Sequence, residues 1–430
     1  LMKILQSITG SLLLKDGTIY DPATGKSSMG SVLIKDGVVE EILSSGKVIS
    51  ADTIINCTGK VITCGFTDIH VHFREPGRED KETLETGSLA ALAGGFTRVC
   101  VMPNTNPVLD TPESIRFILD RAKKLPVEIC PIGAITKGQG GTELAEMGEM
   151  IKAGAVAVSD DGLPVVNGQM MKIAVEYAGQ FGVPVINHAE DVLIRSDGVM
   201  NEGSLSTRLG LSGNPDISES VMVYRDLVIA EYVSGKIHVP HVSTAKSVEL
   251  IRRYKKKGVD VTAEVTPHHL GLNENKLVNY DTNAKVAPPL RTDDDRIALI
   301  EALKDGTIDC IATDHAPHTI EEKESDFNHA PCGMIGLESA FGMVHRTLTE
   351  HGFDIFEIID LLTVNPARVM GFEVLPITKG QKANFTIIDP TSKWTFTKSD
   401  IHSRSKNSPM LGTEFQGEVI TTIFGKNIFS

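Results

Sequence analysis

Residues 61–74 read VITCGFTDIHVHFR, an apolar run that leads directly into two histidines two positions apart. Because alternate residues of a strand point the same way, a strand over residues 61–66 would present His70 and His72 together at its end. Neutral imidazole suits zinc near pH 7, and Asp68 is expected to orient one ring through its other nitrogen. Two ordinary structural histidines would give the same local pattern, so the rest of the chain has to decide.

The composition is that of a folded protein of 430 residues, with 41% hydrophobic and 23% charged residues, enough for one large domain and a smaller one. A formal net charge of -14 would repel a phosphate backbone, so nucleic acid is excluded as an expected partner. No apolar run approaches the length of a membrane span. The six cysteines are scattered without a Cys-x-x-Cys spacing, which predicts reduced thiols and a cytoplasmic protein.

The middle of the chain alternates short apolar runs with helix-compatible segments. Eight β-α repeats over roughly 300 residues favour a closed (β/α)8 TIM barrel over an open doubly wound sheet. The predicted strands cover residues 61–66, 97–102, 127–134, 155–159, 183–187, 236–241, 259–265 and 308–313. The predicted helices cover residues 82–93, 114–124, 142–153, 170–181, 218–233, 243–256 and 294–304.

Both ends of the chain have a different pattern, with strand-like pieces joined by turn dipeptides such as Asp16-Gly17 and Asp36-Gly37. Neither end is long enough to bury a core alone, so we expect the two to meet in one small β-sandwich. The predicted division is therefore residues 1–60 and 372–430 for the sandwich and residues 61–371 for a metal-dependent barrel.

Polar residues follow most of the predicted strands, and the active sites of such barrels lie where the strands end. Four histidines and two carboxylates on one rim would converge on a single cavity, which separate structural histidines do not readily explain. In chain order the polar residues are His70, His72, Arg74, Asn104, Asp160, Asp161, His188, His241, Asp314 and His318.

Four imidazoles and two carboxylates exceed the ligands of one tetrahedral zinc, and one aspartate can bridge two ions. Two ions about 3.5 to 4 Å apart would share a water and lower its pKa from about 15.7 to about 7. A carboxylate beside that water can then move protons, and Asp314 is the residue we expect to do so. Position on the strand leaves open whether Asp160 or Asp161 forms the bridge.

The motifs together resemble the amidohydrolase superfamily and, within it, the bacterial class I dihydroorotases. The resemblance extends over nearly the whole chain. The residues that carry it are 68–77, 93–97, 102–107, 159–162, 187–190, 241–244, 312–318, 336–338 and 365–368.

The resemblance implies two zinc ions per subunit and a role for each ligand. His70, His72 and Asp314 would bind one ion, His188 and His241 the other, and Asp161 would bridge them. Many relatives use a carboxylated lysine as the bridge, but residues 155–159 contain no lysine, and Lys152 lies before the predicted strand.

The implied reaction is the reversible cyclisation of N-carbamoyl-L-aspartate to L-dihydroorotate in pyrimidine synthesis, with Asp314 as the proton shuttle. Arg74, Asn104 and His318 would hold the substrate carboxylate, while Cys332 and Gly333 would contact the pyrimidine ring. The long acidic segment 319–333 is expected to close over the site. Alone, Arg74 would read as a surface ion-pair residue and Asn104 as a turn residue.

One position departs from the family pattern: Ala287 precedes Pro288-Pro289-Leu290-Arg291 where relatives usually carry a substrate-contacting Asn. Losing one hydrogen bond, about 0.5 to 1.5 kcal/mol, predicts weaker ground-state binding and not inactivity.

Two alternatives stay open beside a dihydroorotase. Another cyclic amidase, such as a hydantoinase or allantoinase, would share the metal ligands, although the missing lysine argues against it. A non-catalytic scaffold for aspartate transcarbamoylase is the third reading, although inactive homologues lose the His-x-His pair. The resemblance also implies a homodimer and a complex with that transcarbamoylase as possible assemblies.

Overall fold

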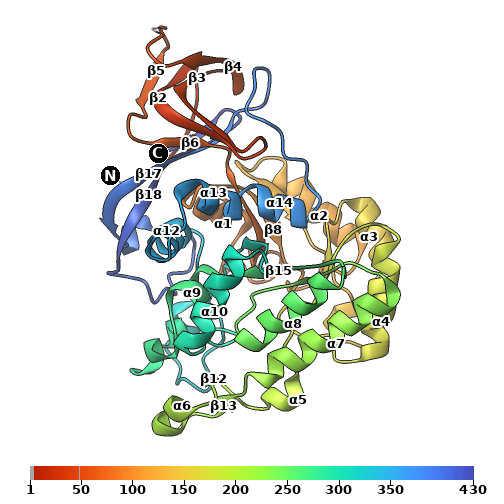
Figure 1. Ribbon diagram of the computed structural model, residues 1–430. Helices are drawn as coiled ribbons and strands as arrows, with labels where there is room; N and C mark the ends of the chain where they lie inside the picture. The colour runs from red at the N-terminus through yellow and green to blue at the C-terminus, as the bar shows by residue number, and fades with distance from the viewer. Residues whose placement is uncertain (1–3, 48) are drawn as a thin grey trace.

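The computed structural model describes residues 4–47 and 49–430, so residues 1–3 and 48 of the predicted N-terminal segment lie outside it. The chain has an α/β fold in which one sheet carries both chain ends and the middle of the chain alternates strands with helices (Figure 1).

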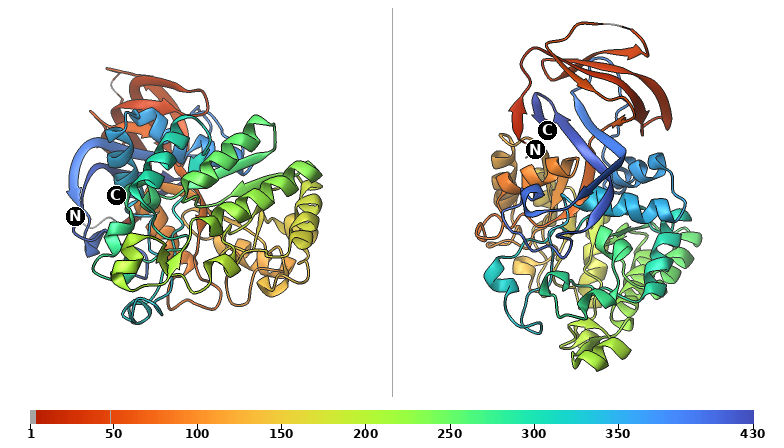
Figure 2. Two further views of the ribbon diagram at one scale, coloured as in Figure 1. Left: turned by 60° about the horizontal axis from the view of Figure 1, so that its bottom comes forward. Right: turned by 90° about the vertical axis from the view of Figure 1, so that its left-hand side faces the viewer.

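Both chain ends contribute strands to one nine-stranded sheet, here called the terminal sheet, with the order β1-β19-β18-β17-β6-β2-β3-β4 and β5 paired to β2. Figure 2 shows the N-terminal and C-terminal ribbons together on one side of the helical part. The terminal sheet has an apolar core of its own, which includes Leu14, Ile34, Phe385 and Ile423. The strands are β1 Leu5–Ser7, β2 Ser11–Asp21, β3 Lys26–Lys35, β4 Val38–Ser44, β5 Thr53–Asn56, β6 Val61–Thr63, β17 Asn384–Thr395, β18 Glu414–Phe424 and β19 Asn427–Phe429.

The prediction of one strand over residues 61–66 was wrong. β6 pairs with β17 and β2 of the terminal sheet, and a separate strand, β7 (Phe66–Val71), begins the central part. Gly65 separates them at a crowded crossing, where an added Cβ would collide with the side chains of Thr97 and Asn384. The chain therefore changes sheets at Gly65, and His70 lies inside β7, while His72 follows directly after it.

The central strands form two parallel sheets, β7-β8-β9 and β10-β11-β14-β15-β16. Two isolated parallel bridges join them, Gly133 to Val158 between β9 and β10, and Val71 to His315 between β7 and the segment after β16. The seven later predicted runs each overlap one strand: β8 Phe96–Val101, β9 Glu128–Pro131, β10 Val158–Ser159, β11 Val185–Ile186, β14 Ile237–Val239, β15 Val261–Val265 and β16 Cys310–Ile311.

Helices cover the outside of these strands and overlap the predicted segments. They start at favourable caps: Thr83, for example, accepts a hydrogen bond from the Thr86 N–H and begins α1. The principal helices are α1 Leu84–Ala93, α2 Pro112–Ala122, α3 Met147–Ala153, α4 Gly168–Gly179, α7 Ile217–Val233, α8 Ala245–Lys256, α10 Asp293–Lys304, α12 Ala340–Glu350, α13 Ile355–Leu362 and α14 Val364–Val369. Shorter elements are α5 Val192–Arg195, α6 Ser204–Leu209, α9 Pro267–Gly271 and α11 Ile320–Lys323, with β12 Met200–Asn201 paired to β13 Gly213–Asn214.

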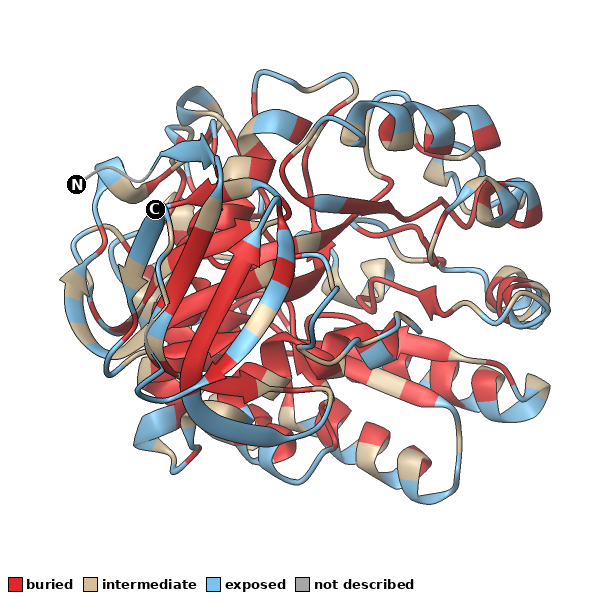
Figure 3. Ribbon diagram, turned by 90° about the horizontal axis from the view of Figure 1, so that it is seen from above, coloured by how far each residue is buried: buried red, intermediate tan, exposed pale blue. Residues whose placement is uncertain are grey.

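The central strands are largely buried and the outer faces of the helices are exposed (Figure 3). One apolar cluster combines side chains from five different central strands: Ile69, Cys100, Cys130, Ile186 and Cys310. All six cysteines are free, as the sequence predicted. Within residues 4–47 and 49–430, none of the helices has the length and apolar character needed to cross a bilayer.

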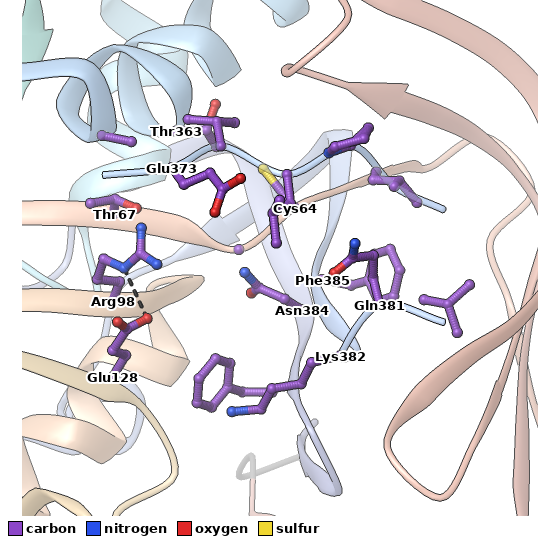
Figure 4. A pocket seen from close by; sticks show the side chains of 18 residues that line it. Cys64, Thr67, Arg98, Glu128, Thr363, Glu373, Gln381, Lys382, Asn384 and Phe385 are labelled. Atoms are coloured by element: carbon purple, nitrogen blue, oxygen red, sulfur yellow. Dashed lines mark hydrogen bonds and ion pairs between the residues drawn. The ribbon is translucent and has the colours of Figure 1, made fainter. Parts of the chain in front are cut away.

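A cavity of about 230 Å³ lies between the terminal sheet and the beginnings of the central strands (Figure 4). Its wall includes Cys64, Thr67, Lys382 and the ion pair in which Arg98 Nε donates to Glu128 Oε2 at 2.9 Å. The predicted metal ligands do not line this cavity: His70 and His72 lie at the opposite end of β7 from Thr67, and the other four follow β10, β11, β14 and β16.

Candidate metal centre

The six predicted metal ligands come together although they are up to 244 positions apart in the sequence. His70 and His72 come from the end of β7, His188 follows β11, His241 follows β14, Asp161 follows β10 and Asp314 follows β16. All six are buried. Two sets of donor atoms lie within 4.8 Å of one another, one on His70, His72 and Asp314 and the other on His70, Asp161 and His241.

The two oxygens of Asp161 face different pairs of histidines. Its Oδ2 lies 3.4 Å from the Nε2 atoms of both His70 and His72. Its Oδ1 lies 3.5 Å from His188 Nδ1 and 3.4 Å from His241 Nε2. A carboxylate in this position can contribute one oxygen to each of two ions.

Asp314 adds a second carboxylate to only one of these pairs. Its Oδ1 lies 3.1 Å from His72 Nε2 and 3.6 Å from His70 Nε2. Asp314 and His241 have positive φ angles of 48° and 35°, in a region that non-glycine residues rarely adopt. Such strain is often found where the surrounding structure fixes functional side chains.

The neighbouring aspartate has a different environment. Asp160 Oδ1 accepts the backbone N–H groups of Ile135 and Thr136 at 2.8 and 3.0 Å, and its Oδ2 accepts the Thr136 hydroxyl. These bonds hold the turn after β9 against the end of β10. The two adjacent carboxylates therefore lie in different places: Asp160 contacts the backbone, and Asp161 lies among the histidines.

The ring of His70 is oriented by Glu264, which the sequence analysis missed. Glu264 Oε1 lies 2.7 Å from His70 Nδ1, and its Oε2 lies 3.1 Å from His238 Nε2. The prediction that Asp68 orients a ring was wrong: its carboxylate accepts backbone N–H groups of His70 and Thr313. With Nδ1 bonded to a carboxylate, His70 directs Nε2 into the centre.

His188 has an equivalent partner that the sequence analysis also missed. Glu190 Oε2 lies 3.0 Å from His188 Nε2, and Asn214 Nδ2 donates to Glu190 Oε1 at 2.6 Å. His188 consequently directs its other nitrogen, Nδ1, toward Asp161. Both missed residues are buried carboxylates. Glu264 interrupts the mostly apolar strand β15, where a carboxylate requires a partner, and that requirement was the available signal for it.

The carboxylates make the electrostatic potential at the centre strongly negative. Burial disfavours a charged His188, yet Asp161 and Glu190 raise the pKa of its imidazole to about 10. Burial likewise opposes ionisation of Asp161, but His70, His188 and His241 hold the pKa of this carboxyl well below its usual range. His70 lowers the pKa of the buried Glu264 to about 2 in the same way.

These residues fit divalent metal ions. His70 Nε2 is buried without a hydrogen-bond partner, although it is surrounded by carboxylate oxygens. Imidazole nitrogens with carboxylate oxygens are a donor set that zinc and related ions accept. A cation would also replace the protons that the carboxylates otherwise hold on the histidines.

Four of the five predicted substrate contacts lie together beside the centre. Arg74 Nη2 lies 3.5 Å from His318 Nε2, which lies 2.8 Å from the Cys332 carbonyl oxygen. A Cβ on Gly333 would lie 3.1 Å from the same His318 nitrogen. Burial and the nearby Arg74 lower the pKa of His318 to about 2, so its imidazole is neutral near pH 7.

Asn104 contacts the predicted metal ligand His72. Its Oδ1 lies 2.8 Å from His72 Nδ1, so this histidine can donate to the amide and direct Nε2 inward. The amide NH2 group remains a donor toward a substrate. Asn104 is thus a residue that orients His72, a role that the sequence analysis did not assign.

Other histidines lie outside this arrangement. His315 Nε2 lies 3.3 Å from Glu82 Oε2, away from the ligands. His269 Nε2 lies 3.1 Å from the Pro288 carbonyl oxygen. His268 Nε2 is buried with no hydrogen-bond partner, and burial lowers its pKa to about 4.

The segment 319–333 is attached to the neighbouring segment by two buried lysines. Lys285 Nζ donates to the Phe327 carbonyl at 2.7 Å, and Lys323 Nζ donates to the Thr282 carbonyl at 2.9 Å. The segment also contains the short helix α11. These bonds hold the Cys332 end next to His318.

Solved structures with the same fold include several hydantoinases. An L-hydantoinase from Arthrobacter aurescens matches with a TM-score of 0.83 over 98% of this chain and 96% of its own, at 23% identity. A D-hydantoinase from a Bacillus sp. AR9 matches with a TM-score of 0.82 over 97% and 95%, at 21% identity. At this level of identity the likeness describes the fold.

Sequence relatives are much closer. A family model described as dihydro-orotase-like matches residues 59–247. A dihydroorotase from Geobacter metallireducens is 44% identical and covers 97% of this chain and 99% of its own length. A dihydroorotase from Pelotomaculum thermopropionicum is 46% identical and covers 97% and 98%. The resemblance drawn from the motifs is thereby confirmed: the chain belongs to the dihydroorotase family.

Proposed function

We propose that the protein is a dihydroorotase that interconverts N-carbamoyl-L-aspartate and L-dihydroorotate with two zinc ions. The observation that carries the proposal is the position of Asp161, whose two oxygens each face a different pair of histidines. The relatives named dihydroorotase at 44% and 46% identity supply the substrate class.

In this proposal each ion has its own ligands. His70, His72 and Asp314 would hold one ion, and these three residues are called here the first half of the centre. His188 and His241 would hold the other ion, in the second half, and Asp161 would contribute one oxygen to each half. When bound, the ions supply a water of lowered pKa and polarise the carbonyl of the substrate.

Asp314 is the proton carrier. In the ring-opening direction its carboxylate takes a proton from the attacking water and delivers it to the leaving ring nitrogen, and in the closing direction it does the reverse. Its ordinary pKa is lowered by His72 and His70 despite burial, so it starts as the base.

The substrate carboxylate is bound by Arg74, Asn104 and His318. The guanidinium of Arg74 can make two parallel hydrogen bonds to a carboxylate, which fixes the orientation of the substrate. The amide NH2 of Asn104 adds an uncharged donor, and the neutral His318 would donate its Nε2–H to the substrate in place of the Cys332 carbonyl. Backbone groups of Cys332 and Gly333 contact the ring, and the segment 319–333 limits the access of water.

Ala287 leaves this set one hydrogen bond short of the family pattern. Restoring the amide with Ala287→Asn is expected to tighten substrate binding by about 0.5 to 1.5 kcal/mol. The effect should appear in KM and leave kcat largely unchanged.

We further propose that the eight central strands close into a (β/α)8 barrel, with the two chain ends forming a small β-sandwich beside it. The bridges between Gly133 and Val158 and between Val71 and His315 support closure. Because β6 pairs with the terminal sheet, the proposed boundary between these parts moves from residue 60 to Gly65. Free cysteines support a cytoplasmic location.

A cyclisation assay with N-carbamoyl-L-aspartate, combined with metal analysis of the purified protein, tests the function. Two zinc equivalents and turnover that is lost on chelation and restored by zinc are expected. Faster turnover of hydantoin or allantoin than of dihydroorotate would reassign the substrate, and an inert, metal-free protein would refute the enzymatic proposal.

A further inference from the structure

A second cavity, here called the acidic cavity, lies beside the contact between α12 and β18 (Figure 1). Its volume is about 180 Å³. The exposed residues Thr395 and Ser399 belong to its wall, so it is reached from solvent. None of the predicted metal ligands or substrate contacts lines it, and it is therefore separate from the metal centre.

The ionisable residues in the wall of the acidic cavity are three carboxylates and His402. Glu338 comes shortly before α12, Asp400 ends a short helical turn, and Glu418 lies in β18. No lysine or arginine among the described residues lines the cavity. The larger cavity beside the terminal sheet differs, because its two basic residues match its two acidic residues. Only the acidic cavity thus has negative charge in its wall without a basic residue to offset it.

Glu338 has a carboxylate oxygen without a partner. The residue is 6% exposed, and its Oε1 accepts the N–H groups of His402 and Ser403 at 3.0 and 2.8 Å. Its Oε2 is buried and has no hydrogen-bond partner. The nearby Lys406 donates instead to the Ile401 and Ser403 carbonyl oxygens at 2.8 and 2.7 Å. A buried carboxylate oxygen of this kind costs free energy unless a bound group supplies a donor.

The other two carboxylates also use one oxygen for donors of the protein. Asp400 Oδ2 accepts the N–H and the hydroxyl of Thr397, both at 2.7 Å. Glu418 Oε2 accepts the Ser392 hydroxyl at 2.7 Å. Each carboxylate is therefore held in place through one oxygen and keeps its second oxygen for a ligand.

Aromatic side chains complete the wall. Trp394, the one tryptophan of the sequence, and Phe341 both line the acidic cavity. Trp394 Nε1 donates to the Gly417 carbonyl at 2.9 Å, which fixes the indole ring. Aromatic faces attract cations and also bury alkyl groups. Carboxylates together with aromatic faces favour an organic cation.

The arrangement of the carboxylates favours an ammonium group over a metal ion or a guanidinium. Within residues 4–47 and 49–430, three His, Cys, Asp or Glu donor atoms lie within 4.8 Å of one another only in the predicted metal centre. A planar guanidinium pairs best with both oxygens of one carboxylate, whereas each carboxylate here offers one. The three donors of an ammonium group point in different directions, which suits single oxygens from separate segments.

We propose that the acidic cavity binds a small molecule that ends in a primary ammonium group. The ammonium group lies among Glu338, Asp400 and Glu418, and the alkyl part lies against Trp394 and Phe341. Pockets for drug-sized ligands measure roughly 300–1,000 Å³, so a cavity of about 180 Å³ indicates a ligand with few heavy atoms. The site is independent of the proposed reaction.

Trp394 provides a readout confined to this cavity. Titration of the purified protein with n-butylammonium chloride should change the tryptophan fluorescence in a saturable way, at constant ionic strength. The uncharged 1-butanol, which has the same alkyl chain, should give no such change at the same concentrations. Glu338→Gln keeps an oxygen for the two N–H groups but removes the charge, so the affinity should fall about 10-fold or more. Glu418→Gln should also weaken binding, and it tests the site from a different element if Glu338→Gln disturbs folding.

Glu128→Gln is the matched control, because it makes the same chemical change in the larger cavity and should leave the affinity unchanged. A lysine derivative with both backbone ends blocked separates a free amine from a lysine side chain of another protein. Tighter binding of that derivative than of n-butylammonium would overturn the small-molecule ligand. The site itself is overturned if the fluorescence shows no saturable change, if 1-butanol gives an equal response, or if both Glu338→Gln and Glu418→Gln keep the wild-type affinity.

Discussion

The two halves of the proposed metal centre differ in charge although they share Asp161. The first half has two histidines and the carboxylate of Asp314, and His70 is backed by Glu264. The second half has His188 and His241, with only Glu190 behind His188. A metal ion in the first half would therefore have two carboxylate ligands, Asp314 and Asp161, whereas an ion in the second half would have only Asp161.

This asymmetry suggests a division of work. The more anionic half should hold its ion firmly and keep the proton carrier Asp314 in place. The less anionic half leaves more positive charge on its ion, which suits polarising a substrate carbonyl. Four experiments, taken from the largest expected effect to the smallest, test whether the halves behave differently.

Replacing the shared carboxylate removes the link between the halves. Asp161→Ala should lose metal from both and reduce kcat/KM on the order of 1,000-fold or more, because neither half retains its bridging oxygen. Metal analysis and the cyclisation assay measure this. Asp160→Asn is the matched control, since Asp160 bonds to the backbone, and it should keep both ions. Retention of two ions by Asp161→Ala would contradict the bridge.

Asp314→Asn changes only the first half. The amide keeps an oxygen near His72 but cannot carry the proton, so kcat should fall about 100-fold to 10,000-fold. KM should change far less. Zinc at the second half should be retained, as judged by anomalous diffraction. A variant with nearly normal kcat would assign the proton transfer to another group.

Stepwise chelation should separate the halves in time. The ion held by His188 and His241 is expected to leave first, because that half has less negative charge to retain it. Anomalous difference density from partly stripped crystals gives the occupancy of each position. Loss of the first-half ion before the other, or equal loss, would remove the proposed asymmetry.

The two backing glutamates offer the finest comparison. Glu264→Gln should weaken zinc binding in the first half by about 10-fold to 100-fold, and Glu190→Gln should do the same in the second. Competition with a chromophoric zinc chelator measures each affinity, and thermal melting controls for the loss of a buried partner. If both variants weaken the same ion, the assignment of glutamates to halves is wrong.

Much of the site could be predicted because its ligands lie at the ends of strands. Once the apolar runs were identified, His188 and Asp314 followed from their positions directly after a run, and His241 from its position as the last residue of one. The choice between Asp160 and Asp161 depended on resemblance, because adjacent residues after a two-residue strand have no periodicity to distinguish them.

The parts that could not be predicted depend on tertiary contacts. Glu264 is 194 positions from His70, and nothing local connects them. The change of sheet at Gly65 was missed because residues 61–66 look like one apolar run, and only the crowding by Thr97 and Asn384 separates the two strands. Hydrophobic periodicity identifies buried strands but does not identify their neighbours.

The proposed bridging group, Asp161, is encoded in the sequence and needs no modification. A carboxylated lysine, by contrast, forms only when dissolved carbon dioxide reacts with the lysine side chain. On the proposed function, this chain would mature as soon as it folds and meets zinc. Its activity after refolding should then be the same in buffers purged of bicarbonate as in buffers that contain it.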